Sequence, residues 1–269
     1  MDWRLHCGRA QDILPGDYEG QVQLVLSSPP YDGLRTYGGA QDAWDFNAVA
    51  DVIVPCLADG GVLVWIVGDQ IHRGSESGTS MQQALAFMER GLRLHQTLIY
   101  ERTHPTPTTD DRCLKNWQYM FVLSNGRPAT ADIPRDRLNV TVGKTRGNHG
   151  AGRHKDGRIK TRTKHVGLTQ ESGKRSSIWR YTTGLHHMGG PVDSNNLIHQ
   201  HPALMPYDLA ADHIACWTAP GDMVMDPLAG GGTTLRAAVD LGRRCVGVEV
   251  NRDYCRIIQQ RMAQGVLAV

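Results

Sequence analysis

The stretch MVMDPLAGGGTTLRAAVDLGRRCVGVE, Met223–Glu249, predicts a strand, a glycine turn, a helix and a second strand. Met223–Asp226 and Cys245–Glu249 are short apolar runs typical of buried strands, and Thr233–Leu241 has helical character between them. Strands that alternate with helices form a mostly parallel sheet with helices on both faces. The fold class that follows is α/β, with a Rossmann-like, doubly wound sheet.

Apolar runs in the first half of the chain extend the predicted sheet to seven strands. The chain is expected to enter the sheet near Leu5, and further strands are predicted at Val22–Leu26, Val62–Val67, Leu94–Tyr100 and Tyr119–Leu123. Helices are predicted over Met81–Arg90, Tyr207–Trp217 and Tyr254–Met262. The first of these helices rests on the spacing of Met81, Leu85 and Met88. The Pro- and Thr-rich segment Thr103–Thr109 is expected to be a loop.

The overall composition says little about partners. The 269 residues include 29 Lys and Arg against 27 Asp and Glu, so the distribution of charge matters more than the net value of +2. No run of about 18 apolar residues is present, and neither a signal peptide nor a membrane span is predicted. The six cysteines lie apart and form no C-x-x-C pair. We therefore expect reduced thiols in a cytoplasmic protein, without a zinc ribbon or a disulfide framework.

A basic segment separates the two apolar halves, so the chain divides into residues 1–126, 127–199 and 200–269. Between Lys144 and Arg180 the acidic residues are Asp156 and Glu171 alone. Because basic side chains neutralise phosphates and release counterions, this segment is expected to bind a nucleic acid. A solvated surface loop is the alternative. The candidate contacts are Lys144, Arg146, Arg153, Lys155, Arg158, Lys160, Arg162 and Lys164.

The glycine turn of the opening stretch is a candidate cofactor site. Glycines let a ligand approach the backbone, and the following helix offers free N–H donors at its N-terminus. Glu249 ends the next strand, where nucleotide-type sites place a carboxylate on the ribose hydroxyls. A dinucleotide site would have glycine in place of Leu235, and a P-loop would need lysine after Gly232. S-adenosylmethionine is the remaining candidate, and an ordinary structural turn is the alternative. The expected cofactor residues are Asp226, Pro227, Leu228, Gly230, Gly232, Thr233, Thr234 and Glu249.

The tetrapeptide Ser28-Pro29-Pro30-Tyr31 follows the strand predicted at Val22–Leu26 and is the candidate catalytic loop. Two prolines fix φ and cannot continue a strand, so the loop is stiff and its carbonyls keep one direction. The hydroxyl of Ser28 and the carbonyl of Pro29 can accept hydrogen bonds from an amine, and Tyr31 can stack on the ring that carries it. A proline turn with a surface tyrosine is the alternative interpretation.

Two such acceptors suit the methylation of a nucleobase amine. The lone pair of this amine is delocalised into the ring, so the amine is a poor nucleophile. Acceptors on its hydrogens favour the pyramidal form, with the lone pair aimed at the sulfonium methyl group. Catalysis then depends on positioning and charge stabilisation, with no covalent enzyme intermediate. In duplex DNA the nucleotide must first be flipped out, which costs a few kcal/mol.

The proline and glycine motifs together resemble the signatures of the β group of DNA amino-methyltransferases, which form N4-methylcytosine or N6-methyladenine. Their order, catalytic motif first, is similar to that group, and so is His201-Pro202 ahead of the helix predicted at Tyr207–Trp217. The resemblance covers about residues 1–125 and 199–265. Two departures are Gly8-Arg9, where the family often has Gly-Asp, and Leu228, where an aromatic residue is more usual.

This resemblance implies a class I methyltransferase fold, S-adenosylmethionine as cofactor and double-stranded DNA as substrate, often within a restriction–modification system. It makes residues 1–126 the catalytic half, 127–199 the inserted target-recognition segment and 200–269 the cofactor-binding half. Homodimers are common in the family. The resemblance places at the target amine Ser28, Pro29, Pro30 and Tyr31, and near the cofactor His201 and Pro202.

The target base is left open, with N4 of cytosine favoured over N6 of adenine because Ser precedes the two prolines. A cytosine-C5 enzyme would need a cysteine nucleophile, for which Pro55-Cys56 is a candidate inside an apolar run. Methylation of RNA or of a protein glutamine, and a DNA-binding module without activity, stay open as well. The histidines between His149 and His201 have neither cysteine partners nor H-E-x-x-H spacing, so no metal is expected.

Overall fold

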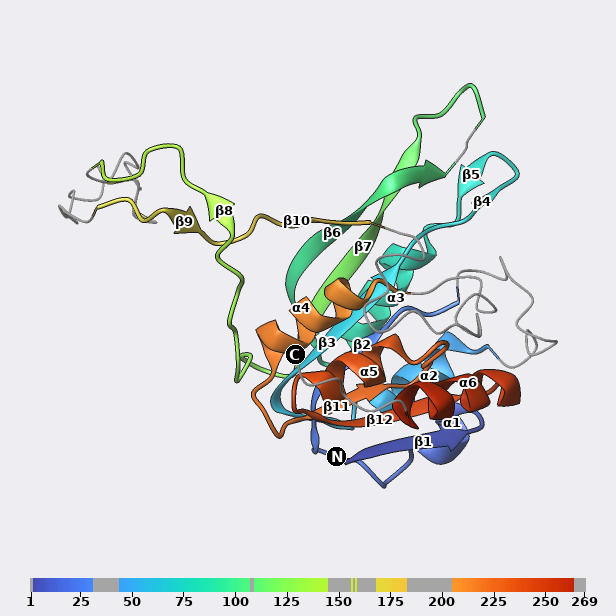
Figure 1. The fold of residues 1–269 in the computed structure, drawn as a ribbon. Coiled ribbons are helices and arrows are strands. Elements are labelled where there is room, and N and C mark those ends of the chain that lie inside the picture. Colours follow the sequence, from blue (N-terminus) through green and yellow to red (C-terminus); the bar gives the residue numbers. More distant parts are fainter. Residues whose placement is uncertain are drawn as a thin grey trace. The chain divides into compact units, whose positions relative to one another are not determined.

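The computed structural model describes residues 2–30, 44–106, 109–144, 156, 158, 168–182 and 205–263, with the side chains of 104–106 excepted. The chain forms two compact units (Figure 1). The larger consists of Met1–Asp132 and Ser177–Val269, and the smaller of Ile133–Ser176. The larger unit contains both predicted motifs, and the smaller lies within the basic segment.

The larger unit is built on one eight-stranded sheet. In order across the sheet, the strands are β1 (Trp3–Cys7), β12 (Arg244–Glu249), β11 (Met223–Asp226), β2 (Val22–Ser27), β3 (Leu57–Val67), β7 (Lys115–Ser124), β6 (Arg93–Thr106) and β10 (Ile178–Tyr181). All neighbours are parallel except the two pairs that β7 makes with β3 and β6. The expected mostly parallel α/β sheet is confirmed. The expected number of seven strands is wrong, because β10 adds an eighth at one edge.

The additional strand, β10, lies where the sequence has no apolar periodicity. It pairs in parallel with β6. The ring of Trp179 is buried and stacks on His213 with the centroids 4.6 Å apart. The hydroxyl of Tyr181 donates to the carboxylate of Asp212 at 2.6 Å. Two anchored aromatic side chains, rather than a long apolar run, therefore hold this short strand.

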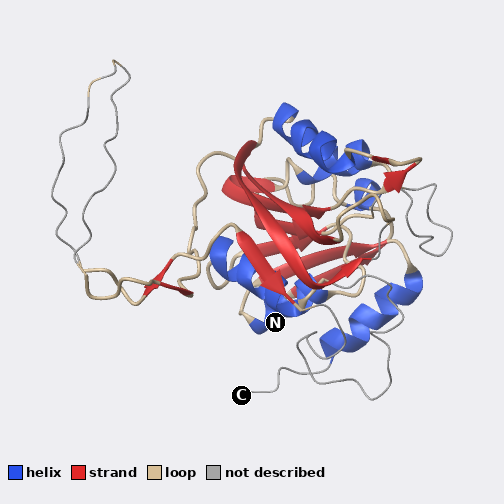
Figure 2. Cartoon of the chain, turned by 90° about the horizontal axis from the view of Figure 1, so that it is seen from above, coloured by secondary structure: helices blue, strands red, loops and turns tan. Residues whose placement is uncertain are grey.

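Helices cover both faces of the sheet (Figure 2). Along one face of the sheet, α1 packs on α2, and α2 packs on α3. In the second half of the chain, α4 packs on α5, and α6 packs against strands β1 and β12. The helices are α1 (Ala10–Ile13), α2 (Phe46–Ile53), α3 (Thr79–Glu89), α4 (Tyr207–Trp217), α5 (Thr233–Asp240) and α6 (Arg252–Ala263). One core cluster includes Trp65 and Phe87, whose rings meet edge to face at 5.2 Å. This packing makes the sheet a rigid support for the loops at its carboxyl edge.

The winding of the sheet reverses between β11 and β2. From β11 the chain passes through α5 to β12 on one side, and from β2 it passes through α2 to β3 on the other. In open α/β sheets, ligands bind outside the carboxyl ends of the strands at such a switch point. Ser27 ends β2 and Asp226 ends β11. The predicted proline and glycine motifs therefore follow two adjacent strands at this point.

Two short ladders complete the described structure. In the larger unit, β4 (Ile71–His72) and β5 (Ser75–Glu76) form a hairpin between β3 and α3. In the smaller unit, β8 (Arg137–Leu138) pairs antiparallel with β9 (Ser172–Gly173). Among the described residues, no helix is both long and apolar enough to cross a membrane.

Candidate active site

A buried hydrogen bond joins the two strand ends from which the predicted motifs begin. Ser27 Oγ donates to Asp226 Oδ1 at 2.8 Å, and both side chains are buried. Asp226 also accepts from the backbone N–H of Leu228 at 3.1 Å and from the side chain of Thr234. The loop that starts at Ser28 therefore begins directly beside the glycine turn.

The turn after β11 depends on two glycines in the left-handed region. Gly230 has a φ of +52° and Gly232 a φ of +77°, which side chains disfavour. A Cβ on Gly232 would also lie 2.9 Å from Cγ1 of Ile258 on α6, which is too close for an ordinary contact. Gly232 is the N-cap of α5. The turn thus leads into a helix N-terminus, where free N–H groups attract a carboxylate.

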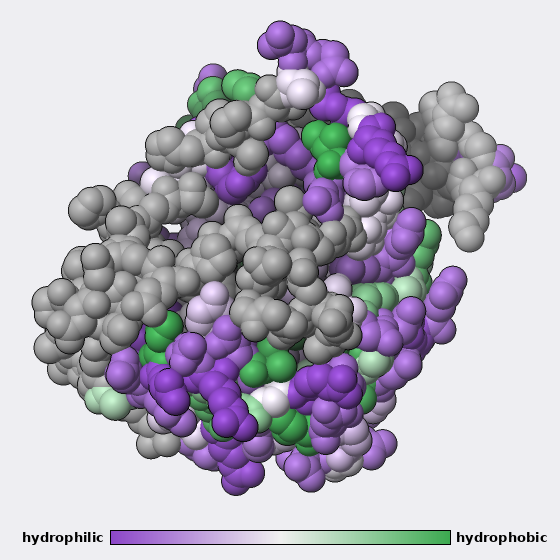
Figure 3. Space-filling model, turned by 90° about the vertical axis from the view of Figure 1, so that its right-hand side faces the viewer, coloured by the Kyte–Doolittle hydropathy of each residue, from purple (hydrophilic) through white to green (hydrophobic). Residues whose placement is uncertain are grey.

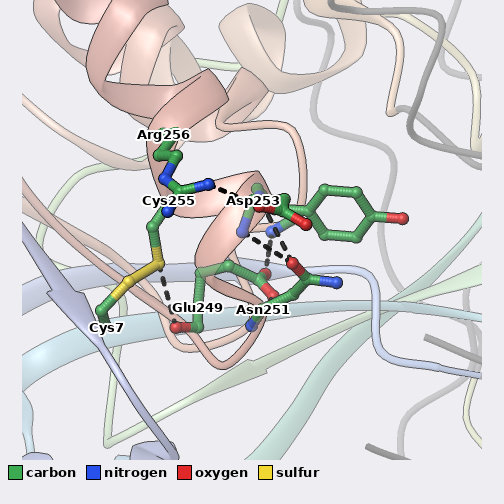
Figure 4. Close-up of a disulfide and its surroundings, with 8 residues drawn as sticks. Cys7, Glu249, Asn251, Asp253, Cys255 and Arg256 are labelled. Carbon is green, nitrogen blue, oxygen red and sulfur yellow. Dashed lines mark hydrogen bonds and ion pairs between the residues drawn. A yellow bond between two sulfur atoms is a disulfide. The ribbon is translucent and has the colours of Figure 1, made fainter. Parts of the chain in front are cut away.

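Glu249 supports this turn from the end of β12. Its carboxylate accepts from the backbone N–H of Gly230 at 2.7 Å and from that of Asn251 at 2.8 Å, and its side chain is buried. Figure 4 shows Glu249 and Asn251 together. An ionised carboxylate has about four acceptor positions, so Glu249 keeps capacity for the hydroxyl groups of a ligand.

The two buried carboxyl groups have raised pKa values. Burial raises the pKa of Asp226 to about 6, although hydrogen bonds from Thr234 and Ser27 oppose the shift. Burial likewise raises the pKa of Glu249 to about 7, and the charge of Asp226 adds to this rise. Two carboxylates that are costly to ionise together favour a cationic ligand. S-adenosylmethionine fits this requirement, since it carries a sulfonium cation and no phosphate.

Helix α6 supports the glycine turn through a residue that the sequence analysis missed. Arg261 is buried and donates to the carbonyl of Gly231. Its own carbonyl accepts from Arg236 at 3.2 Å, and Arg236 forms an ion pair with Asp240 at 2.9 Å. Burial lowers the pKa of Arg261 to about 10. No local pattern marks this residue, because an arginine near the end of a helix is usually solvated.

Cys7 and Cys255 form a disulfide beside Glu249 (Figure 4). Cys7 ends β1 directly opposite Glu249 in the sheet, and Cys255 lies near the start of α6. The sulfur of Cys255 is 3.3 Å from the backbone oxygen of Glu249. The prediction of reduced thiols is therefore wrong for this pair. A sequence separation of 248 positions gives no signal of such a bond.

The other predicted site residues differ in burial. The buried ones are Pro29, Pro227, Thr233 and Thr234. The half-buried ones are Ser28, Pro30 and Leu228. Three predicted catalytic or cofactor residues lie outside the described part of the chain, namely Tyr31, His201 and Pro202.

The model of the N6/N4 DNA methylase family matches residues 22–260. The chain belongs to the DNA methylase family. One relative of this methylase is M.BamHII, an orphan methyltransferase of Bacillus amyloliquefaciens. It is 38% identical over 246 residues, which are 91% of this chain and 90% of the relative. The type II methyltransferase M.SmaI of Serratia marcescens is 23% identical over 304 residues, covering 94% and 91%.

Two solved structures share the fold of the methylase. The cytosine-N4-specific PvuII DNA methyltransferase aligns with a TM-score of 0.70 at 16% identity, over 100% of this chain and 89% of that one. The complex of M1.HpyAVI with S-adenosylmethionine aligns with a TM-score of 0.61 at 15% identity, over 97% and 100%. The methylase therefore has the class I methyltransferase fold. Because it also belongs to the DNA methylase family, the predicted cofactor, S-adenosylmethionine, is confirmed.

Cys56 of the methylase does not suit a C5 mechanism. It precedes β3, at the opposite end of the strand from the active-site edge. Its sulfur donates to the carbonyl of Val52 at 3.1 Å, and burial raises the pKa of its thiol to about 11. A C5 nucleophile must be a thiolate near neutral pH. The C5 mechanism is therefore set aside.

Two of the predicted DNA contacts of the methylase are described, and both are exposed. These are Lys144 and Arg158, of which Arg158 lies 3.6 Å from the carboxylate of Asp156. The others lie outside the described residues: Arg146, Arg153, Lys155, Lys160, Arg162 and Lys164. Figure 3 shows the right-hand side of the molecule as drawn in Figure 1. Hydrophilic residues, in purple, predominate among its coloured atoms.

Proposed function

We propose that this methylase transfers a methyl group to the N4 amine of a cytosine that is flipped out of double-stranded DNA. The observation that carries the proposal is the position of Ser28. It directly follows Ser27, whose hydroxyl holds Asp226 at the switch point of the sheet. The short polar side chain of Ser28 can therefore contact the target amine beside the glycine turn.

The proline loop supplies acceptors rather than a nucleophile. Ser28 Oγ and the carbonyl of Pro29 accept the amine hydrogens and favour the pyramidal nitrogen, while Tyr31 stacks on the base. S-adenosylmethionine, when bound, supplies the electrophilic methyl group. The proton released from the amine leaves through an acceptor or water, with no covalent enzyme intermediate.

The cofactor is proposed to lie along the glycine turn. Asp226, Gly230, Gly232 and Thr233 surround its methionine portion, with its carboxylate at the N-terminus of α5. Glu249 accepts the ribose hydroxyls. Residues that complete the cofactor site are Pro227, Leu228, Thr234, His201 and Pro202.

DNA is proposed to bind through the inserted segment 127–199, between a catalytic half at 1–126 and a cofactor half at 200–269. The compact unit Ile133–Ser176 holds twelve of the 29 Lys and Arg but three of the 27 Asp and Glu. The rest of the chain then has seventeen basic against 24 acidic residues. The excess of basic residues that attracts phosphates therefore lies in this unit. DNA as substrate also places the methylase in the cytoplasm.

Nucleoside mass spectrometry of DNA methylated in vitro tests the target base. We expect N4-methylcytosine, and N6-methyladenine alone would reverse the assignment. Parallel reactions with RNA and with a glutamine-containing peptide are expected to yield no product. Ser28→Ala is expected to lower kcat by about 100-fold while leaving the affinity for S-adenosylmethionine unchanged. A wild-type rate in this variant would refute the amine contact.

Salt-dependent DNA binding tests the role of the basic segment. The double variant Lys160→Glu/Arg162→Glu is expected to weaken binding and to reduce the slope of log K against log salt by about 0.9 for each phosphate that is no longer neutralised. The control is Arg4→Glu/Arg93→Glu, which reverses two exposed charges of the larger unit. Equal decreases in the two variants would show that binding responds to net charge alone.

A further inference from the structure

Ser27 is absent from the predicted site, yet its side chain connects the two strand ends from which the motifs begin. It is fully buried at the last position of β2. Its Oγ donates to Asp226 Oδ1 at 2.8 Å, and its backbone lies opposite Trp65 of β3 in the sheet. The next residue, Ser28, is the proposed acceptor for the amine. Any displacement of the Ser27 backbone therefore also displaces Ser28 and the catalytic loop.

The hydrogen bond from Ser27 stabilises one protonation state of Asp226. A hydroxyl donor favours the ionised carboxyl group, and Asp226 receives such donors from Ser27 on β2 and Thr234 on α5. Leu228 adds a backbone N–H. Among the described residues, the charged group coupled to Asp226 is Glu249 of β12, whose own pKa is raised by the charge of Asp226. Each donor therefore matters for keeping Asp226 ionised.

We propose that Ser27 is a positioning residue for methyl transfer: its hydroxyl keeps the carboxylate of Asp226 ionised and fixes the proline loop against the cofactor turn. The inference rests on the proposed role of Asp226 in holding the cationic cofactor. It does not depend on which base is methylated. Ser27 touches neither substrate nor cofactor in this arrangement and acts through Asp226 and Ser28.

The test is the pH dependence of S-adenosylmethionine binding, measured by calorimetry from about pH 5.5 to about pH 8.5. Binding of the wild-type protein should weaken in acid as Glu249 and then Asp226 are protonated, near their pKa values of about 7 and about 6. The part that belongs to Asp226 should be the part that responds to Ser27. Ser27→Ala removes one stabilising donor, so the acid limb, the pH below which binding weakens, should rise by about one unit, which is about a fivefold weaker affinity at pH 6. At high pH the affinities should converge. An unshifted limb in Ser27→Ala would overturn the proposal.

Two variants separate this role from a loss of packing. Ser27→Thr keeps the hydroxyl and should retain the wild-type profile. Ser28→Ala, one position further along, should lower turnover without moving the acid limb. A limb that moves equally in Ser27→Thr and Ser27→Ala would show that packing, rather than the hydroxyl, is responsible. If Ser27→Ala does not fold, Ser27→Cys replaces it, since a thiol is a weaker donor of similar size. The proposal then requires that cofactor binding by Ser27→Cys weakens at a higher pH than binding by the wild type.

These outcomes can be told apart from failure of the proposed function. If the wild-type protein binds the cofactor with the expected pH dependence but yields no N4-methylcytosine, the base assignment fails and the role of Ser27 stands. If cofactor binding has no acid limb at all, the role of Asp226 is wrong, and the inference about Ser27 is wrong with it.

Discussion

At the scale of single residues, the site is dominated by carboxyl groups that are buried before any ligand is present. Asp226 and Glu249 both have raised pKa values, mainly because they are removed from water. In the absence of the cofactor, their ionisation at neutral pH opposes folding. The two buried carboxylates therefore lower the folding stability of the methylase without cofactor, and they form a site that can bind a cation.

The first prediction concerns the pH dependence of stability without cofactor. Because the pKa of Glu249 is raised from about 4.5 to about 7 on folding, the folded state binds the extra proton between these values. The contribution of Glu249 to stability thus disappears as pH rises through that window. We expect Glu249→Gln to gain up to about 3 kcal/mol relative to the wild type between about pH 5 and about pH 8. Denaturant unfolding at both pH values measures this difference, and a constant difference would contradict the assigned pKa.

The second prediction compares two glycines with similar backbone conformation. Gly232 and Gly242 have φ values of +77° and +73°, but only at Gly232 does a new Cβ meet Ile258 within 4 Å. Gly242→Ala is expected to cost about 1 kcal/mol, from backbone strain alone. Gly232→Ala is expected to cost about 3 kcal/mol and to weaken cofactor binding, because α6 must shift as well.

Thermal unfolding and calorimetry of both glycine variants provide the measurement. Ile258→Ala removes the Cγ1 and Cγ2 atoms of the crowded contact, so Gly232→Ala should cost less stability in the Ile258→Ala background than in the wild type. Equal destabilisation at the two glycines would show that the packing of α6 on the turn is unimportant.

At the scale of helices and strands, most elements of the cofactor half follow from local patterns. α4 and β11 begin and end at the predicted residues, Tyr207–Trp217 and Met223–Asp226. Both combine a clear apolar period with short connections. β6, by contrast, runs to Thr106, into the Pro- and Thr-rich segment that the sequence marks as a loop. There the long antiparallel pairing with β7 outweighs the local preference.

Helix α3 is predicted correctly as a helix, but the face that was expected to be buried is exposed. The three apolar residues that define the predicted stripe are exposed: Met81, Leu85 and Met88. The buried face instead carries polar side chains that have partners. Gln83 accepts from Trp65 Nε1 at 2.7 Å, and Ser80 Oγ donates to Asp69 at 2.6 Å. A hydrophobic period does not reveal such partners, because they come from other strands and loops.

The site residues that belong to a single sequence motif could be predicted. Those that act through contacts between distant segments could not. The residues of the proline and glycine motifs are readable because turn chemistry is local. Ser27 and Arg261 act through contacts with segments far away in the sequence. Their side chains have no local signature, so only the folded chain identifies them.

The third prediction tests β10 as an integral strand of the sheet. Trp179→Ala removes a buried ring that stacks on His213 and is expected to cost about 3–5 kcal/mol. Arg180→Ala, the next residue, breaks a largely exposed ion pair with Glu101 and should cost less than about 1 kcal/mol. Denaturant unfolding of both variants measures the contrast. If Trp179→Ala is as mild as Arg180→Ala, the segment is not needed for the folded sheet.

At the scale of the whole molecule, the two units carry opposite net charge. The small unit has twelve basic against three acidic residues, while the unit with both motifs has 24 acidic against seventeen basic ones. This division agrees with their proposed tasks, since phosphates need cations and the cofactor is itself a cation. The near-neutral total of +2 conceals it.

The last prediction concerns the bond that joins the two ends of the larger unit. The disulfide links Cys7 on β1 to Cys255 on α6 across 248 positions, so it closes almost the entire chain into a loop. Such a bond restricts the unfolded chain, and its reduction is expected to cost about 2–4 kcal/mol. Reduction should also weaken cofactor binding, because α6 packs on the glycine turn through Ile258. Cys7 is exposed, so a dithiol reductant can reach the bond.

Mass spectrometry after alkylation of the unfolded, unreduced protein should therefore count four free thiols, and six after reduction. The variant Cys7→Ser/Cys255→Ser should have the lower stability from the start and show no response to a dithiol. Cys113→Ser, which removes an exposed free cysteine, should respond like the wild type. In the cytoplasm, the location proposed for this methylase, thiols are kept reduced and the bond would open, so its stabilisation is expected only in oxidised protein. Six free thiols in protein purified without reductant would show that the sheet and α6 hold together without the bond.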